Sequence, residues 1–258
     1  MVNYLSNSET VIKMTDCSVL LPLKTNQTGD FRREVVQSIL GGEIFKNRKK
    51  RSYVRAINKV SLEIKKGERI GVVGSNGSGK TTFLKTISGV YAPQEGKIDI
   101  NVDMVSLLNL GFGMQPELSG EENLANLCVQ FNLNVKQTIN RAQEILDFSQ
   151  LGEFFYQPVK TYSSGMRMRL LLAVATLSPA DMLVMDEWFS TGDASFRLRA
   201  DKRISKHLDR SGILILASHN IGLLQKWTSK TIWFHRGEIK KIGKTDDITR
   251  EYLEFSKL

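Results

Sequence analysis

Several features that mark particular classes of protein are missing from this 258-residue sequence. It has two cysteines, Cys17 and Cys128, whose separation matches no metal-binding or redox spacing. We interpret both as reduced thiols of a cytoplasmic protein. The first residues have neither the basic part nor the apolar part of a signal peptide. The most apolar window, residues 168–185, is interrupted by charged residues and a proline, so no segment is predicted to cross a bilayer.

The sequence also has no internal repeats, no low-complexity segments and no sustained heptads. With 41% hydrophobic and 24% charged residues it has the composition of a soluble globular protein, long enough for one large domain or two small ones. The formal net charge is +9, and many of the cations are close together. They are Lys46, Arg48, Lys49, Lys50, Arg51, Arg55 and Lys59. Such a cluster suits nucleic acid or anionic lipid head groups, or is simply a solvated loop.

The stretch from Gly74 to Thr82 reads GSNGSGKTT and is the clearest motif in the chain. It follows an apolar strand-like run and precedes a helix-like pattern, which is the context of a phosphate-binding loop. Glycines let the backbone turn tightly and bring N–H groups onto phosphate oxygens, and the helix adds its positive end. We expect Lys80 to hold the β- and γ-phosphates and Thr81 to contact Mg²⁺. The predicted loop comprises Gly74, Ser75, Asn76, Gly77, Ser78, Gly79, Lys80, Thr81 and Thr82.

Strand-like and helix-like segments alternate along most of the chain, which predicts an α/β fold with a mostly parallel sheet. The predicted strands cover 9–21, 56–64, 70–73, 96–100, 104–108, 182–185, 213–216 and 231–234. A helix with Phe196, Ala200, Ile204 and Leu208 on one stripe follows the strand at 182–185, and a C-terminal helix follows a turn at Gly237. Residues 22–52 are interpreted as a long loop containing one short helix, with Phe31, Val35 and Ile39 on its apolar side.

Between Pro116 and Tyr162 the pattern becomes helical, which indicates a small helical subdomain inserted into the α/β core. Ser119 with Glu122 matches a capping box, and so does Asn134 with Gln137. Ile139, Ala142 and Leu146 are predicted to form the buried side of the second helix of this part.

Two further strand ends carry polar side chains suited to phosphate chemistry. Asp186 and Glu187 end the apolar run at 182–185, where Asp186 can support Mg²⁺ and Glu187 can polarise an attacking water. His219 follows the strand at 213–216 and can bind the γ-phosphate or position the water. In isolation the acidic pair can also be merely solvated, and His219 can be a capping or core residue.

About 85 residues after the phosphate loop, Tyr162-Ser163-Ser164-Gly165-Met166 opens a helix and presents hydroxyls and free N–H groups to an anion. Taken alone, this turn can also be an ordinary N-cap, but we predict a second anion site here. Its position just before Asp186 and Glu187 resembles the signature loop of ABC-type ATPases. The resemblance covers roughly residues 56–243, with the motifs in the family's order. It implies a head-to-tail homodimer in which the signature loop of one subunit closes on ATP held by the phosphate loop of the other.

The resemblance also implies roles for individual residues. Ser163, Ser164 and Gly165 take the signature positions, Asp193 lies in the loop that links the two ATP sites, and His219 is the switch histidine. Tyr53 is the candidate for stacking on adenine. The sequence departs from the common pattern at Ser164 and Met166, and Gln115 comes several residues later than the usual glutamine that contacts Mg²⁺.

These departures resemble the polysaccharide-exporter branch of ABC transporters, as does the run from Leu107 to Leu118. Members of that branch drive lipid-linked O-antigen, capsule or teichoic acid through a separate membrane permease. The resemblance implies ATP and Mg²⁺ as ligands, and two ATPase chains with two permease chains at the cytoplasmic face of the inner membrane. O-antigen of lipopolysaccharide is the expected substrate, and no nucleic-acid partner is expected.

The alternative is a soluble ABC-type ATPase acting on nucleic acid or ribosomes, with the basic cluster as its contact face.

The expected organisation is one P-loop NTPase core (1–112 and 161–258) with a small antiparallel β part and a helical subdomain (113–160). No C-terminal carbohydrate-binding domain is expected. We expect the permease to dock on the helical subdomain and the Leu107–Leu118 segment. We expect the helix at 30–41 and the basic cluster to lie at the permease–membrane boundary.

Overall fold

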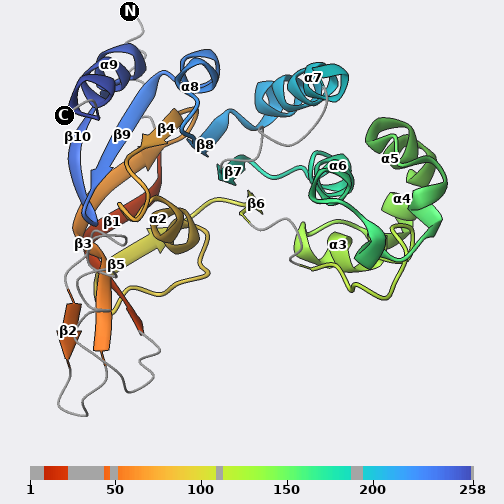
Figure 1. The fold of residues 1–258 in the computed structure, drawn as a ribbon, viewed down its shortest axis with the longest axis horizontal. Helices are drawn as coiled ribbons and strands as arrows, with labels where there is room; N and C mark the ends of the chain where they lie inside the picture. Colours follow the sequence, from red (N-terminus) through yellow and green to blue (C-terminus); the bar gives the residue numbers. More distant parts are fainter. Residues whose placement is uncertain (1–8, 23–43, 47–51, 109–112, 187–193, 257–258) are drawn as a thin grey trace, which may run out of the picture. The chain divides into compact units, whose positions relative to one another are not determined.

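The computed structural model describes residues 9–22, 44–46, 52–108, 113–186 and 194–256 (Figure 1). The chain forms two compact units, and each is described by itself. The first unit comprises residues 1–102 and 213–258, and the second comprises residues 103–212. The phosphate loop therefore belongs to the first unit, and the predicted helical subdomain lies within the second.

The first unit contains an antiparallel sheet with the strand order β2-β3-β1-β5. Its strands are β1 (Thr10–Pro22), β2 (Ile44–Lys46), β3 (Ser52–Lys65) and β5 (Glu95–Ile100). Val11, Ile12 and Met14 are buried on β1, and Val54, Ile57, Val60 and Ile64 are buried on β3. The two strands pair with several register shifts, and Asp16 within β1 has a positive φ of 47°. This sheet is the small antiparallel part that the sequence predicts.

Parallel strands make up most of the second sheet of this unit. β4 (Arg69–Val73) lies between β8 (Ile213–Ala217) and β9 (Lys230–His235) and is parallel to both. β10 (Glu238–Lys244) adds an antiparallel edge to β9. The helices of the unit are α2 (Lys80–Ile87), α8 (Ile221–Trp227) and α9 (Thr245–Phe255). Phe83 of α2 packs on Phe234 of β9, with ring centroids 4.9 Å apart, and both rings are fully buried.

The second unit combines a pair of parallel strands with helices. Its strands are β6 (Met104–Leu107) and β7 (Met182–Asp186). Its helices are α3 (Leu124–Gln130), α4 (Val135–Ile139), α5 (Ala142–Ser149), α6 (Ser164–Ala175) and α7 (Ala194–Ser211), with 3₁₀ turns η1 (Gly152–Tyr156) and η2 (Val159–Thr161). α6 is buried at every position from Leu170 to Ala175. The predicted stripe of α7, Phe196, Ala200, Ile204 and Leu208, is buried as expected.

The structure confirms the predicted α/β class with a largely parallel sheet and a small antiparallel one. Three local predictions are wrong. Ile44–Lys46 is a strand paired with β3, whereas the sequence suggested loop or helix throughout 22–52. The strand β10 was not predicted. The predicted second helix of the helical part is split into α4 and α5, so Ile139 is 51% exposed and Ile145 is buried instead.

The two predicted N-cap residues of the helical part, Ser119 and Asn134, each accept a hydrogen bond from a backbone N–H. Glu122 N donates to Ser119 Oγ at 3.1 Å, and Ser119 N donates to Glu122 Oε2 at 2.8 Å, which is a reciprocal capping box. Ser119 Oγ also donates to Glu122 Oε2 at 2.9 Å, and the bonds from Ser119 N and Ser119 Oγ to this carboxylate lower the pKa of Glu122. Asn134 accepts from Gln137 N at 3.0 Å and caps α4. The helix predicted around residues 30–41 and the basic residues 48–51 lie outside the described residues.

Candidate nucleotide-binding site

The predicted phosphate loop leaves the buried strand β4 and enters α2 at Lys80. Gly74, Gly77 and Gly79 have φ values of +155°, +77° and +107°, which disfavour any residue with a side chain. A Cβ on Gly74 would clash with the carbonyl oxygen of Phe234 and with Ser78 Oγ, and a Cβ on Gly79 would lie 2.6 Å from the carbonyl oxygen of Ala56. The motif therefore needs glycine at all three positions for the backbone angle, and at Gly74 and Gly79 also for space.

Two side chains of the loop are buried and polar. Lys80 is 8% exposed, and its Nζ donates to the carbonyl oxygens of Gly74 at 2.8 Å and Ser75 at 3.1 Å. Ser78 is 2% exposed, and its Oγ has no hydrogen-bond partner among the described residues. A buried hydroxyl without a partner is costly unless a ligand or water bonds to it. A glycine-lined turn with a buried cation, a buried hydroxyl and a helix N-terminus fits a phosphate group.

The turn between β9 and β10 holds this loop through main-chain hydrogen bonds. Gly237 N donates to the carbonyl oxygen of Ser78 at 2.9 Å, and Asn58 N of β3 donates to the carbonyl oxygen of Gly237, also at 2.9 Å. Gly237 has a φ of +82°, and a Cβ there would lie 3.1 Å from the carbonyl oxygen of Ala56. The loop is thus joined by its backbone to the antiparallel sheet.

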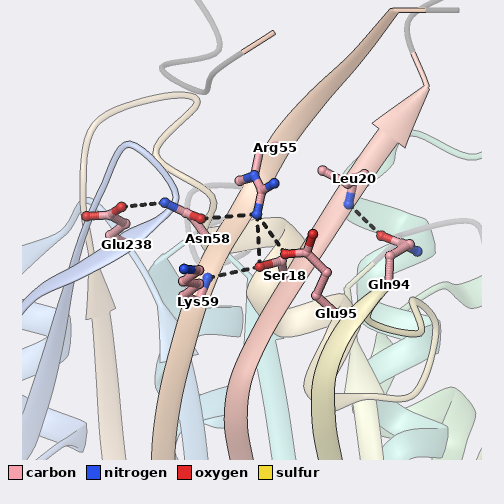
Figure 2. Close-up of polar contacts among 8 residues, drawn as sticks. All are labelled: Ser18, Leu20, Arg55, Asn58, Lys59, Gln94, Glu95 and Glu238. Atoms are coloured by element: carbon pink, nitrogen blue, oxygen red, sulfur yellow. Dashed lines mark hydrogen bonds and ion pairs between the residues drawn. The ribbon is translucent and has the colours of Figure 1, made fainter. Parts of the chain in front are cut away.

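A polar network on that sheet fixes the same part of β3 (Figure 2). Arg55 Nη1 donates to Glu95 Oε2 at 2.8 Å, to Ser18 Oγ at 3.2 Å and to Asn58 Oδ1 at 3.3 Å. Asn58 in turn donates to Glu238 Oε1 on β10. Hydrogen bonds from Arg55 and Ser18 lower the pKa of Glu95. The sequence does not indicate this role for Arg55 and Asn58, because apart from each other their partners are 37 to 180 residues away.

The first unit also holds Tyr53 and His219. Tyr53 is half-buried on β3, three residues before the Ala56 carbonyl that faces Gly79. His219 is exposed two residues after β8. β8 is parallel to β4, and Ser218 N donates to the carbonyl oxygen of Val72 at 3.3 Å. His219 therefore follows the C-terminal end of β8, next to the C-terminal end of β4 where the phosphate loop begins. The role of His219 near a bound phosphate stays a prediction.

Asp186, Gln115 and Ser163 belong to the second unit. Asp186 is the last residue of β7 and is half-buried. Glu187 and Asp193 lie outside the described residues, and their roles stay predictions. Among the described residues there is no cluster of three or more His, Cys, Asp or Glu that could hold a metal. A Mg²⁺ ion bound to one carboxylate, one hydroxyl and substrate phosphates needs no such cluster.

The predicted second anion site is built as a helix cap. Ser163 is the N-cap of α6, and its Oγ accepts from Met166 N at 3.2 Å. Ser163 and Ser164 are exposed and Gly165 is half-buried, and the first turn of α6 contains no acidic residue. The exposed N-terminus of a 12-residue helix with two serines favours an anion. The predicted start of a helix at this turn is confirmed, and anion binding there stays a prediction.

Gln115 is exposed, and its backbone is held by Asn123, a residue that the sequence analysis did not identify. Asn123 is fully buried. Its Oδ1 accepts from Gln115 N at 2.7 Å, and its Nδ2 donates to the carbonyl oxygens of Gln115, Leu118 and Ser119 at 2.9–3.1 Å. Val159 N and Lys160 N donate to the carbonyl oxygens of Leu118 and Pro116. These bonds join the Gln115–Ser119 segment to the chain that leads into Ser163.

Comparison with known proteins agrees with this arrangement. The ABC transporter family model matches residues 57–190. The O-antigen export system ATP-binding protein RfbE of Yersinia enterocolitica is 36% identical over 218 residues, which are 84% of this chain and 91% of that protein. RfbB of Myxococcus xanthus, with the same description, is 39% identical over 79% of this chain and 46% of its own length. The teichoic acids export ATP-binding protein TagH of Lactococcus lactis is 34% identical over 92% of this chain and 48% of its own length.

Solved structures show the same fold. The ATP-binding cassette MJ0796, determined as a dimer in a post-hydrolysis state with ADP and Pi, has a TM-score of 0.68 at 18% identity, covering 91% of this chain and 98% of that one. An ATP-binding subunit of an ABC transporter has a TM-score of 0.69 at 19% identity, covering 94% and 93%. The fold and the phosphate loop define an ATP-binding cassette. The chain belongs to the ABC transporter family, and it spans about half the length of RfbB and TagH.

Proposed function

We propose that this chain is the ATPase subunit of a polysaccharide exporter, hydrolysing ATP to drive a lipid-linked polymer through a separate membrane permease. The observation that carries the proposal is the phosphate loop, in which buried Lys80, unpartnered Ser78 Oγ and glycines at 74 and 79 form a cradle for phosphate. The relatives are named for O-antigen export and teichoic acid export, which supports a polysaccharide as the transported class. Of these two polymers we propose O-antigen.

Each predicted site residue has its own role in the proposed hydrolysis of ATP. The N–H groups of the loop and Lys80 bind the phosphates, and Tyr53 stacks on adenine. Thr81 and Asp186 would hold Mg²⁺, which neutralises phosphate charge when bound, with Gln115 as a further candidate ligand. Glu187 accepts a proton from the attacking water, and His219 orients that water. Ser163, Ser164 and Gly165 of a second copy contact the γ-phosphate, and Asp193 links the two sites.

The permease would dock on the second unit. No helix among the described residues is both long and apolar enough to cross a membrane. Several large apolar side chains of the helical segment are exposed: Val129, Ile139, Phe154 and Tyr156 are between 50% and 80% accessible. Exposed apolar side chains on one segment favour a protein partner. In the proposed complex, two ATPase chains and two permease chains assemble at the cytoplasmic face of the inner membrane.

ATP hydrolysis by the purified chain tests the catalytic part. Lys80→Ala is expected to lose nucleotide binding, because it removes the buried cation of the cradle. Glu187→Gln is expected to bind ATP but lose about 10²–10⁴-fold in turnover. Lys85→Ala is the matched control, since Lys85 is on the same helix but faces the ring of Tyr91. Turnover by Glu187→Gln at the parent rate would show that Glu187 is not the base.

Light scattering tests the dimer. Glu187→Gln with ATP and Mg²⁺ is expected to have twice the mass of the same protein without nucleotide, and an equal mass in both conditions would contradict ATP-bridged pairing. Export is tested separately by deleting the gene and separating the surface glycans of the cell on a gel. Loss of long-chain O-antigen supports the proposed substrate, loss of another polymer reassigns it, and an unchanged glycan pattern contradicts polysaccharide export.

Cysteine cross-linking tests the docking surface. Single cysteines at positions 113–118 should cross-link to a membrane protein in whole membranes, whereas Glu254→Cys on α9 should not. The native Cys17 and Cys128 are buried, so they are weak competitors for the reagent. Capture of nucleic-acid-binding proteins alone at 113–118 would contradict the proposed permease partner.

A further inference from the structure

The second unit contains a strongly basic groove that the nucleotide-binding residues do not use. It lies between α5, the C-terminal end of α6 and α7, and its volume is about 380 Å³. Among the described residues, six Arg and Lys side chains and one carboxylate, that of Glu144, line it. The six are Arg141, Arg199, Lys202, Arg203, Lys206 and Arg210.

Two of the six cations already have structural partners. Arg141 and Arg203 share Glu144, with N–O distances of 2.7 and 3.1 Å. Arg203 also donates to Thr176 Oγ1 at 2.7 Å and to the carbonyl oxygen of Ala173 at 3.1 Å. Its guanidinium lies 4.4 Å from the ring centroid of Phe148. These contacts fix the wall of the groove, and they engage the one carboxylate that lines it among the described residues.

The other four cations have no ion pair with any described residue. They follow one face of α7 at spacings of three and four residues, along about 16 Å of helix. Arg199 Nη2 is buried and has no hydrogen-bond partner among the described residues. A buried guanidinium N–H without an acceptor is costly, and four like charges along one wall repel each other. An anionic ligand with several oxygens would relieve both costs.

The size of the groove and the arrangement of its cations favour a ligand with several phosphate groups over a single phosphate. A volume of about 380 Å³ is in the range of small-molecule sites and exceeds what one phosphate fills. Arginine offers a planar fork of donors that matches phosphate oxygens, and the two lysines add point charges along the same face. A spread of about 16 Å between the outermost cations suits several linked phosphates better than one.

We propose that this groove binds an oligophosphate, meaning two or more linked phosphate groups, through Arg199, Lys202, Lys206 and Arg210. It shares no residue with the phosphate loop or with the Ser163–Gly165 turn, so it would be a third anion site in the chain. The ligand chemistry can come from a free oligophosphate or from a pyrophosphate head group carried on a lipid, and the experiment separates these sources. The site does not depend on the proposed transport function.

Calorimetric titration with inorganic tripolyphosphate tests the site in the full chain. Lys80→Ala is used as the background, to weaken binding at the phosphate loop. On that background Lys202→Gln/Lys206→Gln is expected to bind at least about tenfold more weakly, since each lost charge-assisted contact contributes strongly. Lys65→Gln/Lys66→Gln is the matched control, because it removes the same charge from an exposed turn of the first unit. The control should bind as the background does.

Further titrants separate the sources and the competing explanation. If vesicles of phosphatidylcholine with 10 mol% farnesyl pyrophosphate retain the background protein at lower anion concentration than free tripolyphosphate requires, the lipid source is favoured, and the reverse favours a free ligand. Tighter binding of a hexaglutamate peptide than of tripolyphosphate would overturn the proposal in favour of an acidic peptide. Equal affinities of the groove and control variants would show that the groove is only a solvated basic surface.

Discussion

The hydroxyl of Tyr162 donates a hydrogen bond of 2.6 Å to the carbonyl oxygen of Phe154. Tyr162 directly precedes the N-cap Ser163, and Phe154 belongs to η1, so this bond ties the start of α6 to the helical segment before it. The side chain is buried, and burial raises the pKa of Tyr162 to about 12. The neutral phenol is therefore the form that the folded state requires.

Alkaline pH should destabilise the protein through this residue. Because the folded-state pKa lies above the ordinary value of 10.0, the stabilisation is complete below pH 10 and is lost as the pH rises towards 12. Tyr162→Phe should cost about 1 kcal/mol at pH 7, through the lost hydrogen bond. It should also reduce the steepness of the decline in unfolding free energy between pH 10 and 12. Urea titrations across this range measure both effects, and parallel declines in parent and variant would contradict the assignment.

Gly120→Ala should be destabilising, because its Cβ would clash with Tyr162 Oη and lie 3.0 Å from the carbonyl oxygen of Phe155. Overpacking of this kind costs about 1–3 kcal/mol. Removing the hydroxyl makes room, so Gly120→Ala/Tyr162→Phe should be more stable than the sum of the single changes predicts. Strict additivity in thermal or urea unfolding would show that the two residues do not share this space.

Ser163→Ala removes the N-cap of α6 and should cost about 1 kcal/mol of stability. Asn134→Ala is the control, because it removes the N-cap of α4 in the same unit. Both variants should lose similar stability, but only Ser163→Ala should lower ATP turnover in the dimer. Equal turnover in the two variants would reduce Ser163 to a capping residue.

Gly237→Ala should weaken nucleotide binding although it changes no residue of the phosphate loop. Gly237 has a φ of +82° and donates to the carbonyl oxygen of Ser78, and a Cβ there would lie 3.1 Å from the Ala56 carbonyl oxygen. Gly67→Ala is a matched control, with a φ of +81° and no atom within 4 Å of the added Cβ. Both should lose about 1 kcal/mol from backbone strain. ATP affinity should fall only in Gly237→Ala, and an equal affinity in both variants would contradict this coupling.

Asn123→Leu should loosen the segment that carries Gln115, because it leaves several carbonyl oxygens without donors. A loss of about 2–4 kcal/mol is expected, with faster amide exchange between Gln115 and Ser119. Asn126→Ala removes only the 3.2 Å bond to Asn123 Oδ1 and should cost far less. Similar losses in the two variants would contradict the central role of Asn123.

The features that the sequence predicts well depend on residues that are close together in the chain. The phosphate loop, the capping residues and the stripe of α7 each depend on residues close together in the chain, so their spacing is sufficient. The strand β10 was missed because a register shift between Ile239 and Lys241 breaks its alternation, and β2 is only three residues long. The break at Asn140 and Arg141 resets the helical phase, which exposes Ile139 and buries Ile145.

The parts of the site that escaped prediction depend on distant partners. Asn58 contacts Glu238 across 180 residues, and no local pattern indicates that pairing. Asn123 holds Gln115 from eight residues away, but asparagine after a capping box is too common to suggest it. The sequence does not reveal the groove on α7 either, because the pattern of its cations is typical of the solvent-exposed side of an amphipathic helix.

The contacts that seat the phosphate loop are made by the main chain. Ala56 presents its carbonyl oxygen to Gly79, and Gly237 joins Ser78 to Asn58 through N–H and carbonyl groups alone. Because every residue type except proline carries these groups, amino-acid changes along β3 leave the seat in place. A change of side chain at Ala56 or Asn58 therefore does not by itself remove these main-chain contacts. An alanine scan of this strand would overlook the seat, whereas Asn58→Pro, which removes one N–H, would reveal it.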